Sequence, residues 1–232
     1  MLFFDPLYLI MVMPAILLGI YAQYKVTSAY KKYLSVGNFS RLTGLDAARR
    51  LLQGAGLSHI TVEGVPGQLT DHYDPKSKTL RLSDGVARSA SVASMAIVAH
   101  EVGHAVQDEQ GYAPLRLRGF IVPGVKIGAW LGPLLFLIGF FLIGSEPLAW
   151  LGVILYGSVA LFALATLPTE FNASSRAIAL LTSSGMIVER EEEKGARAVL
   201  NAAALTYVAV TFQALAQMLY YVTLLTGGRR RD

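Results

Sequence analysis

Cysteine is absent from all 232 residues of the chain. Its absence excludes a disulfide framework, a cysteine-ligated zinc finger, an iron–sulfur cluster and a thiol nucleophile. Histidine is scarce as well, with only 4 residues. Any bound metal must therefore use these few imidazoles together with carboxylates.

Charge is the second scarcity. Asp, Glu, Lys and Arg make up 16% of the residues, against about 25% in ordinary soluble proteins. Hydrophobic residues reach 53%, and this balance is typical of a membrane protein. The net charge of +4 is common in membrane proteins, and no basic stripe with interleaved aromatics is present. We therefore expect a lipid bilayer, and no nucleic acid, as a partner.

Four uncharged runs are long enough to cross the hydrocarbon core, which takes about 17–20 residues. The predicted spans are residues 6–24, 127–144, 147–167 and 202–226. The first follows Asp5 with no basic residue before it and no small-residue cleavage site after it, so we expect a retained anchor. Only two residues, Ser145 and Glu146, separate the second span from the third, which predicts a tight antiparallel hairpin.

The Lys and Arg residues predict the orientation in the cell membrane. Four spans place residues 25–126 and 168–201 on one side, and this side holds nearly all the basic residues, so we expect it to be cytoplasmic. The basic tail, residues 229–231, then falls outside, against the rule. Because residues 202–226 also contain polar side chains, a position partly in the interface or over a polar chamber stays open for them.

The segment 25–126 is too polar to lie in lipid, so we expect a small membrane-apposed domain there. Thr43 and Asp46 form a capping-box-like start for a helix, with the carboxylate near the positive end of the helix dipole. Gly54 and Gly56 predict its end.

Short strands are also expected in this segment. Residues 68–73 and 79–83 are strand-like runs on either side of Asp74-Pro75-Lys76-Ser77, which predicts a β-hairpin. Residues 60–63 are a candidate third strand. We expect the run 79–83 to offer an edge to an extended substrate through main-chain hydrogen bonds.

The sequence His100-Glu101-Val102-Gly103-His104 lies in a mostly apolar run, residues 89–108, that predicts a buried helix. Positions four apart share a helix face, so His100 and His104 can bind one ion while Glu101 reaches a metal-bound water. This is the pattern of zinc peptidases. Two core histidines satisfied by polar neighbours remain the alternative.

Catalytic zinc generally takes three protein ligands and leaves one position open. Glu170 is the best candidate for the third ligand, because it follows the span 147–167 directly on the same predicted side as the histidines. Pro168 and Thr169 predict a helix start just before it. A Glu buried next to a membrane span is costly unless a cation holds it.

Three segments carry a family resemblance: residues 69–75 (LTDHYDP), 100–107 (HEVGHAVQ) and 167–174 (LPTEFNAS). In this order, with hydrophobic spans between the second and third, they resemble the YugP-type membrane zinc metallopeptidases. More distantly they are similar to HtpX and the CAAX-prenyl-protease-like gluzincins. The resemblance covers the chain from about Tyr24 to Tyr221.

The resemblance implies a zinc-dependent, membrane-embedded endopeptidase with a gluzincin-like site. Its Zn²⁺ ligands would be His100, His104 and Glu170, and Glu101 would be the general base toward a zinc-bound water. The expected substrates are peptides or proteins in or near the membrane. A homo-oligomer or a regulatory membrane partner is left open.

Supporting residues are also expected around the site. The distant relatives place an Asp four residues after the ligand Glu, where this chain has Ser174. Ser174 and Asn172 are therefore candidates for orienting a ligand histidine. The developing oxyanion needs a donor, for which Arg176, His72 and Tyr73 are candidates, although each has an ordinary structural alternative.

The expected fold is mostly α, a multi-pass membrane protein with a four-helix transmembrane bundle and a small gluzincin-like α+β catalytic domain. The predicted organisation is an anchor (1–24), a catalytic subdomain (25–126), a transmembrane hairpin (127–167), a third-ligand helix with an acidic helix start (168–201), and a fourth transmembrane helix with a basic tail (202–232).

Two other functions stay open. An intramembrane-cleaving protease would carry its histidine pair inside a spanning helix, but the uncharged run before Glu101 begins only at Ser89. A non-catalytic zinc-binding scaffold or transporter-like protein is the second, with Gln213 and Gln217 lining a path or joining helices. A purely structural zinc site has no need of Glu101.

Overall fold

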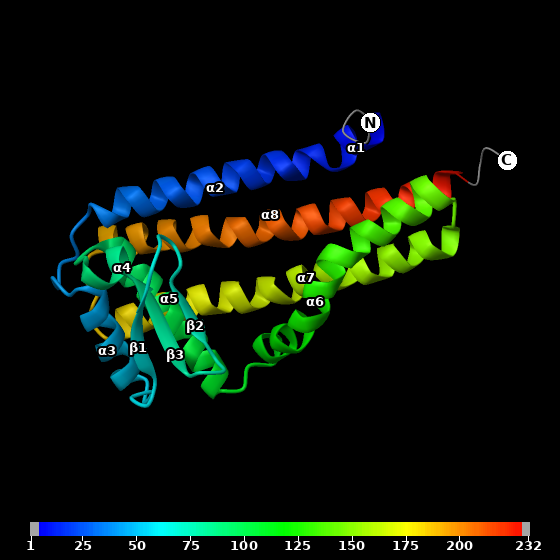
Figure 1. Cartoon of the computed structure of the whole chain (residues 1–232). Helices are drawn as coiled ribbons and strands as arrows, with labels where there is room; N and C mark the ends of the chain where they lie inside the picture. Colours follow the sequence, from blue (N-terminus) through cyan, green and yellow to red (C-terminus); the bar gives the residue numbers. More distant parts are fainter. Residues whose placement is uncertain (1–4, 229–232) are drawn as a thin grey trace. The chain divides into compact units, whose positions relative to one another are not determined.

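The structure is a computed structural model that describes residues 5–228. The chain is mostly helical with one small sheet, as expected (Figure 1). The helices are α1 (Pro6–Met11), α2 (Met13–Leu34), α3 (Gly44–Gly54), α4 (Asp84–Arg88), α5 (Val92–Glu109), α6 (Ala113–Leu137), the π-helix η2 (Ile138–Ile143), α7 (Glu146–Ser183) and α8 (Arg190–Gly228). The strands are β1 (Thr61–Val65), β2 (His72–Asp74) and β3 (Thr79–Ser83).

The described residues form two compact units, each discontinuous in sequence. The helical unit consists of residues up to 22, 114–168 and from 206 onward. The mixed unit, which contains the sheet, consists of residues 23–113 and 169–205. Helices α7 and α8 each contribute residues to both units. The five-part functional organisation given above remains a prediction.

Among residues 5–228, three helices are long and apolar enough to cross a membrane. They run over Ala113–Ile143, Glu146–Ser183 and Arg190–Gly227, and they contain the predicted spans 147–167 and 202–226 in full and 127–144 up to Ile143. The predicted basic tail, residues 229–231, lies outside the described residues.

The first predicted span, residues 6–24, is not among these three helices. The helix is divided at Val12 into α1 and α2, and the second half of α2 carries Lys25, Lys31 and Lys32. Of these two helices only α2 is long enough to span a membrane, and its polar second half lowers its mean hydropathy. A fourth crossing and a four-helix transmembrane bundle therefore remain predictions.

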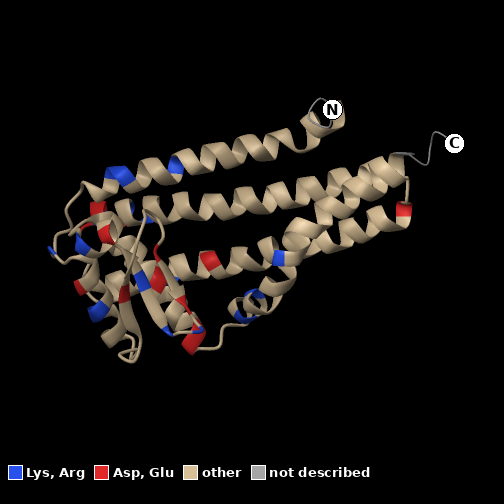
Figure 2. Ribbon diagram, viewed as in Figure 1, with Lys and Arg blue, Asp and Glu red and all other residues tan. Residues whose placement is uncertain are grey.

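In the helical unit, glycines of α6 and of η2 let α7 pack closely against both. A Cβ built at Gly132 would lie 2.8 Å from the backbone N of Tyr156, and one at Gly139 would lie 2.5 Å from the backbone N of Ala149. Residue numbers rise along one helix and fall along the other, so the predicted antiparallel hairpin is confirmed. Figure 2 shows few charged residues along it.

The sheet belongs to the mixed unit and has the order β1-β3-β2. Strands β2 and β3 pair antiparallel, which confirms the predicted hairpin, and β1 joins as the third strand, parallel to β3. The expectation that residues 79–83 offer an edge is wrong, because β3 is central and paired on both sides. Its edge is occupied by β1, which returns in parallel register with Val62 opposite Leu80.

The core of the mixed unit fixes α5 in place. Leu80 and Leu82 of β3 pack with Met95, Val98 and Val102 of α5, and all are at most 1% exposed. Helix α5 also contacts α3 and β2 (Figure 1). Each such side chain contributes about 1.5–3 kcal/mol when fully buried, so the helix that carries the histidine pair is held rigidly.

The expectation that a helix begins at Pro168 is wrong. Helix α7 runs without a break over Glu146–Ser183, with Pro168 inside it. Proline favours the first turn because its missing N–H is not needed there, but long apolar helices tolerate the loss of one interior hydrogen bond. Glu170 therefore lies on the same helix as the predicted span 147–167.

Candidate metal centre

Helix α5 presents His100 and His104 on one face, one turn apart. Ser91 caps the helix, because its Oγ accepts a hydrogen bond from the backbone N–H of Ser94 at 3.2 Å. The two imidazole rings stand edge to face, with centroids 4.7 Å apart and planes at 87°. A ring nitrogen of each can therefore point toward a common position.

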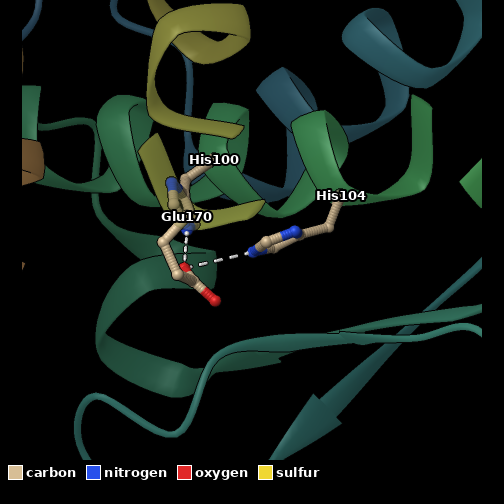
Figure 3. Close-up of side chains that lie close together, drawn as sticks. All are labelled: His100, His104 and Glu170. Carbon is tan, nitrogen blue, oxygen red and sulfur yellow. Dashed lines mark hydrogen bonds and ion pairs between the residues drawn. The ribbon is translucent and has the colours of Figure 1, made fainter. Parts of the chain in front are cut away.

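Glu170 reaches this position from α7. Gly103, between the two histidines, lets α7 approach closely: a Cβ at Gly103 would lie 2.8 Å from the carbonyl oxygen of Ala173. As a result, Oε2 of Glu170 lies 3.1 Å from Nε2 of His100 and 3.4 Å from Nε2 of His104. Figure 3 shows both imidazoles directed at the carboxylate.

These three groups fit a zinc ion. Their ligand atoms all lie within 4.8 Å of one another. Two atoms bound to one tetrahedral zinc at 2.0–2.1 Å lie about 3.3 Å apart, which matches the two distances to Oε2. Glu170 is 1% exposed, and a carboxylate so deeply buried needs a compensating cation. Two imidazoles and a carboxylate are a donor set typical of zinc.

Glu101 lies beside the group of His100, His104 and Glu170 and is not one of its three members. Its Oε2 accepts a hydrogen bond from the backbone N–H of Tyr73 at 2.9 Å, so the edge strand β2 holds it in place. Burial raises the pKa of the Glu101 carboxyl, while the charges of His100 and His104 act against that rise. Such a group suits proton transfer near neutral pH better than an exposed carboxylate does.

Tyr73 and His72 sit on β2. The hydroxyl of Tyr73 donates to Oδ2 of Asp108 at 2.8 Å, and Lys78 binds the same oxygen at 2.7 Å. Burial and the hydrogen bond to Asp108 raise the pKa of Tyr73. His72 is exposed, and its Nδ1 lies 2.8 Å from the carbonyl oxygen of Thr70.

Three further residues of α7 lie near the group of His100, His104 and Glu170. The hydroxyl of Ser174 is 3.2 Å from Nδ1 of His100. Asn172 Oδ1 accepts a hydrogen bond from Nε of Arg176 at 2.7 Å. The Arg176 guanidinium also lies over the ring of Tyr112, 6.0 Å from its centroid.

Gln107 is a site residue that was missed from the sequence. It is fully buried, its Oε1 lies 2.9 Å from Nδ1 of His104, and its Nε2 donates to the carbonyl oxygen of Thr169 at 2.9 Å. The available signal was its position three residues after His104, which places the two side chains together on a helix. A glutamine is neither a usual zinc ligand nor a general base, so residue type alone did not predict a role for Gln107.

Comparison with known proteins agrees with this geometry. Residues 8–226 match a family described as "Putative neutral zinc metallopeptidase". The chain is 44% identical to "Putative membrane protease YugP" of Bacillus subtilis (strain 168) over 223 residues, covering 96% of this chain and 98% of that protein. No solved structure matches. The chain therefore belongs to the YugP-type family of neutral zinc metallopeptidases.

Proposed function

We propose that the protein is a zinc-dependent endopeptidase whose metal ligands are His100, His104 and Glu170 and whose general base is Glu101. The observation that carries this proposal is the meeting of Glu170 with both imidazoles, within 4.8 Å, although it lies 66 positions after His104 (170 minus 104). Membership in a zinc metallopeptidase family supports the choice of metal.

The division of labour follows from the positions of the groups. Bound zinc would lower the pKa of a coordinated water to about 7 and polarise the scissile carbonyl. Glu101 accepts the proton of the attacking water and returns it to the leaving amine. The N–H of Tyr73 holds the Glu101 carboxylate at 2.9 Å, which limits the rotation of the base during the transfer.

The three candidate oxyanion donors differ in how many of their hydrogens are already used in hydrogen bonds. The hydroxyl of Tyr73 is bonded to Asp108, and Nε of Arg176 is bonded to Asn172. His72 donates its Nδ1 hydrogen to the carbonyl oxygen of Thr70, so its Nε2 can donate only when the ring is protonated. The terminal nitrogens of Arg176 always carry hydrogens, and the hydrogen bond to Asn172 does not use them. We propose Arg176 first for this reason.

The substrates we propose are membrane proteins or segments close to the membrane. Three helices of the described residues can span a bilayer, and the relative's name describes a membrane protease. The catalytic side is proposed to be cytoplasmic because of the distribution of Lys and Arg.

The competing functions have less support. Helix α5, with the histidine pair, is not among the candidate spans found in residues 5–228, which argues against cleavage by a pair inside a spanning helix. A non-catalytic zinc scaffold has no use for a carboxylate that is held beside the ligands by the backbone of Tyr73. The scaffold remains the second candidate, to be separated by experiment.

The decisive variant is Glu101→Gln, measured on the detergent-purified chain with casein-like and membrane-protein substrates. The amide keeps the size of the side chain but cannot accept the proton. Hydrolysis should fall about 10²–10⁴-fold, while zinc content by elemental analysis stays at one ion per chain. Glu109→Gln, on the exposed end of the same helix, is the matched control and should cleave like the wild type.

Two outcomes would contradict the proposal. Equal cleavage by wild type and Glu101→Gln would mean that a contaminating protease is responsible. A wild type that holds zinc and cleaves nothing in the panel would favour the scaffold.

A further inference from the structure

A chain of hydrogen bonds leads from Arg176 to the ligand His104, and its direction can be read from its first member. A guanidinium has only N–H donors. Its Nε lies 2.7 Å from the side-chain oxygen of Asn172. Only an acceptor can face Nε, so the oxygen of Asn172, and not its amide nitrogen, must occupy this position.

The next member is Gln107. The same Asn172 oxygen lies 2.9 Å from Nε2 of Gln107, and the carbonyl oxygen of Thr169 lies 2.9 Å from it on another side. A backbone carbonyl can only accept. Two acceptors therefore fix the amide nitrogen of Gln107 at this end, which leaves its oxygen at the other end.

That oxygen faces His104. Oε1 of Gln107 lies 2.9 Å from Nδ1 of His104, and an amide oxygen cannot donate. Nδ1 must therefore carry the hydrogen, and in a neutral imidazole the lone pair is then on Nε2. This is the nitrogen that lies 3.4 Å from Oε2 of Glu170. Two acceptors at that separation need a cation between them, which is a metal ion in the loaded site and a proton when the ring is charged.

We propose that Gln107 and Arg176 are positioning residues that fix the tautomer of His104, so that its Nε2 lone pair is ready for the metal before the metal arrives. Arg176 acts through Asn172 and Gln107 and touches no ligand itself. The use of this lone pair by zinc rests on the proposed function. The tautomer is a property of the protein without metal.

The other ligand histidine offers an internal comparison. Nδ1 of His100 has only the hydroxyl of Ser174 at 3.2 Å in the corresponding place, and a hydroxyl can donate or accept. Nothing in this contact selects a tautomer. On the Nδ1 side, hydrogen-bond direction therefore fixes the ring of His104 and not that of His100.

The tautomer can be measured directly by ¹⁵N NMR of the imidazoles in the full-length, detergent-solubilised chain, stripped of metal and at a pH where the rings are neutral. The chain has only 4 histidines, so His59→Asn and His72→Asn suffice to simplify the assignment. In the wild type, His104 should carry its hydrogen on Nδ1 alone.

Two substitutions of Gln107 separate positioning from packing. Gln107→Leu removes the acceptor, so His104 should become a mixture of tautomers. Zinc affinity, measured by competition with a chelator, should fall about 10–100-fold. Gln107→Glu keeps an oxygen opposite Nδ1 but places its other oxygen against two acceptors. Gln107→Glu should therefore keep the His104 tautomer that Gln107→Leu loses, even though the thermal stability of the protein falls. If Gln107 had only a structural role, the tautomer would not depend on the oxygen at this position.

Two substitutions on α7 test the rest of the chain. Arg176→Met removes the donor that orients Asn172, and should weaken zinc binding by roughly 10-fold, at the lower end of the range for outer partners. Asn172→Asp keeps acceptors on both sides and should leave the tautomer unchanged. Ser174→Ala is the control at His100 and should leave His104 unaffected.

The proposal is overturned if His104 in the wild type carries its hydrogen on Nε2, or if Gln107→Leu keeps the Nδ1 hydrogen with unchanged zinc affinity. If Gln107→Leu does not fold, Arg176→Met and Gln107→Glu decide by the same two measurements. None of these measurements uses peptide hydrolysis, so loss of the proposed function would leave the tautomer result standing.

Discussion

Glu170 is the residue at which burial and charge conflict most directly. Its carboxylate is 1% exposed, and both imidazoles contact one of its oxygens. The free energy of such a buried anion is favourable only when positive charge lies close by. A metal ion at the meeting point of the three side chains would supply that charge.

Glu170→Gln should therefore lose zinc while keeping the shape of the side chain. We expect zinc affinity to fall by at least the ~100-fold that marks the upper limit for outer partners, measured by chelator competition. The control is Glu189→Gln, an exposed position just before α8. An equal loss in the two variants would reject Glu170 as a ligand.

Some residues of the candidate site could be predicted from the sequence, and others could not. The spacing of His100 and His104 follows from the geometry of a helix alone, and Glu170 was found because a carboxylate beside a membrane span needs a partner. The contacts of Gln107 and of the Tyr73 N–H were not predictable, since they depend on rotamers and on neighbours far away in the chain.

At the scale of elements, α5 and α7 owe their close approach to one missing side chain. Gly103→Ala should favour the α5 helix by up to about 1 kcal/mol in propensity, yet the new Cβ would meet the Ala173 carbonyl at 2.8 Å. We expect zinc affinity to fall by about 10-fold. Gly54→Ala, where a Cβ meets nothing within 4 Å, is the control. Unchanged zinc binding in Gly103→Ala would show that the contact is not needed.

The hairpin of α6 and α7 gives a second matched pair. A Cβ at Gly128 would overlap the Leu155 carbonyl, whereas one at Gly124, one turn earlier, meets nothing within 4 Å. Gly128→Ala should destabilise the protein by about 1–3 kcal/mol, and Gly124→Ala should be neutral or slightly stabilising. Thermal unfolding in detergent measures both. Equal midpoints would contradict the packing described for this hairpin.

Apolar run length explains why three of the spans and their hairpin could be predicted. Two other features could not be. A proline has a strong preference for the first turn of a helix, but the rest of α7 overrides it at Pro168. The sheet order could not be predicted either. Strand β1 pairs in parallel with β3, and the residues of a strand do not indicate which other strand it pairs with.

At the scale of the whole molecule, orientation across the membrane is the main prediction still to be tested. In this cysteine-free chain, Lys76, in the β2–β3 turn, and Ser145, before α7, are predicted to lie on opposite sides, and a single cysteine at each tests this. An impermeant thiol reagent on intact cells should label Ser145→Cys and spare Lys76→Cys. Detergent-permeabilised cells, where both should react, are the control. The reverse pattern would refute a cytoplasmic site.

The order of the three proposed metal ligands along the chain has a consequence for biosynthesis. His100 and His104 are made first, and Glu170 follows only after α6, η2 and the first part of α7. At about 5–20 residues per second, the 66 residues from Ala105 through Glu170 (170 minus 104) take about 3–13 s to synthesise. During that interval a nascent chain carries two imidazoles and a carboxylate base but no complete site. On the proposed function, the site of a growing chain therefore stays incomplete until α6 and the first part of α7 have been made.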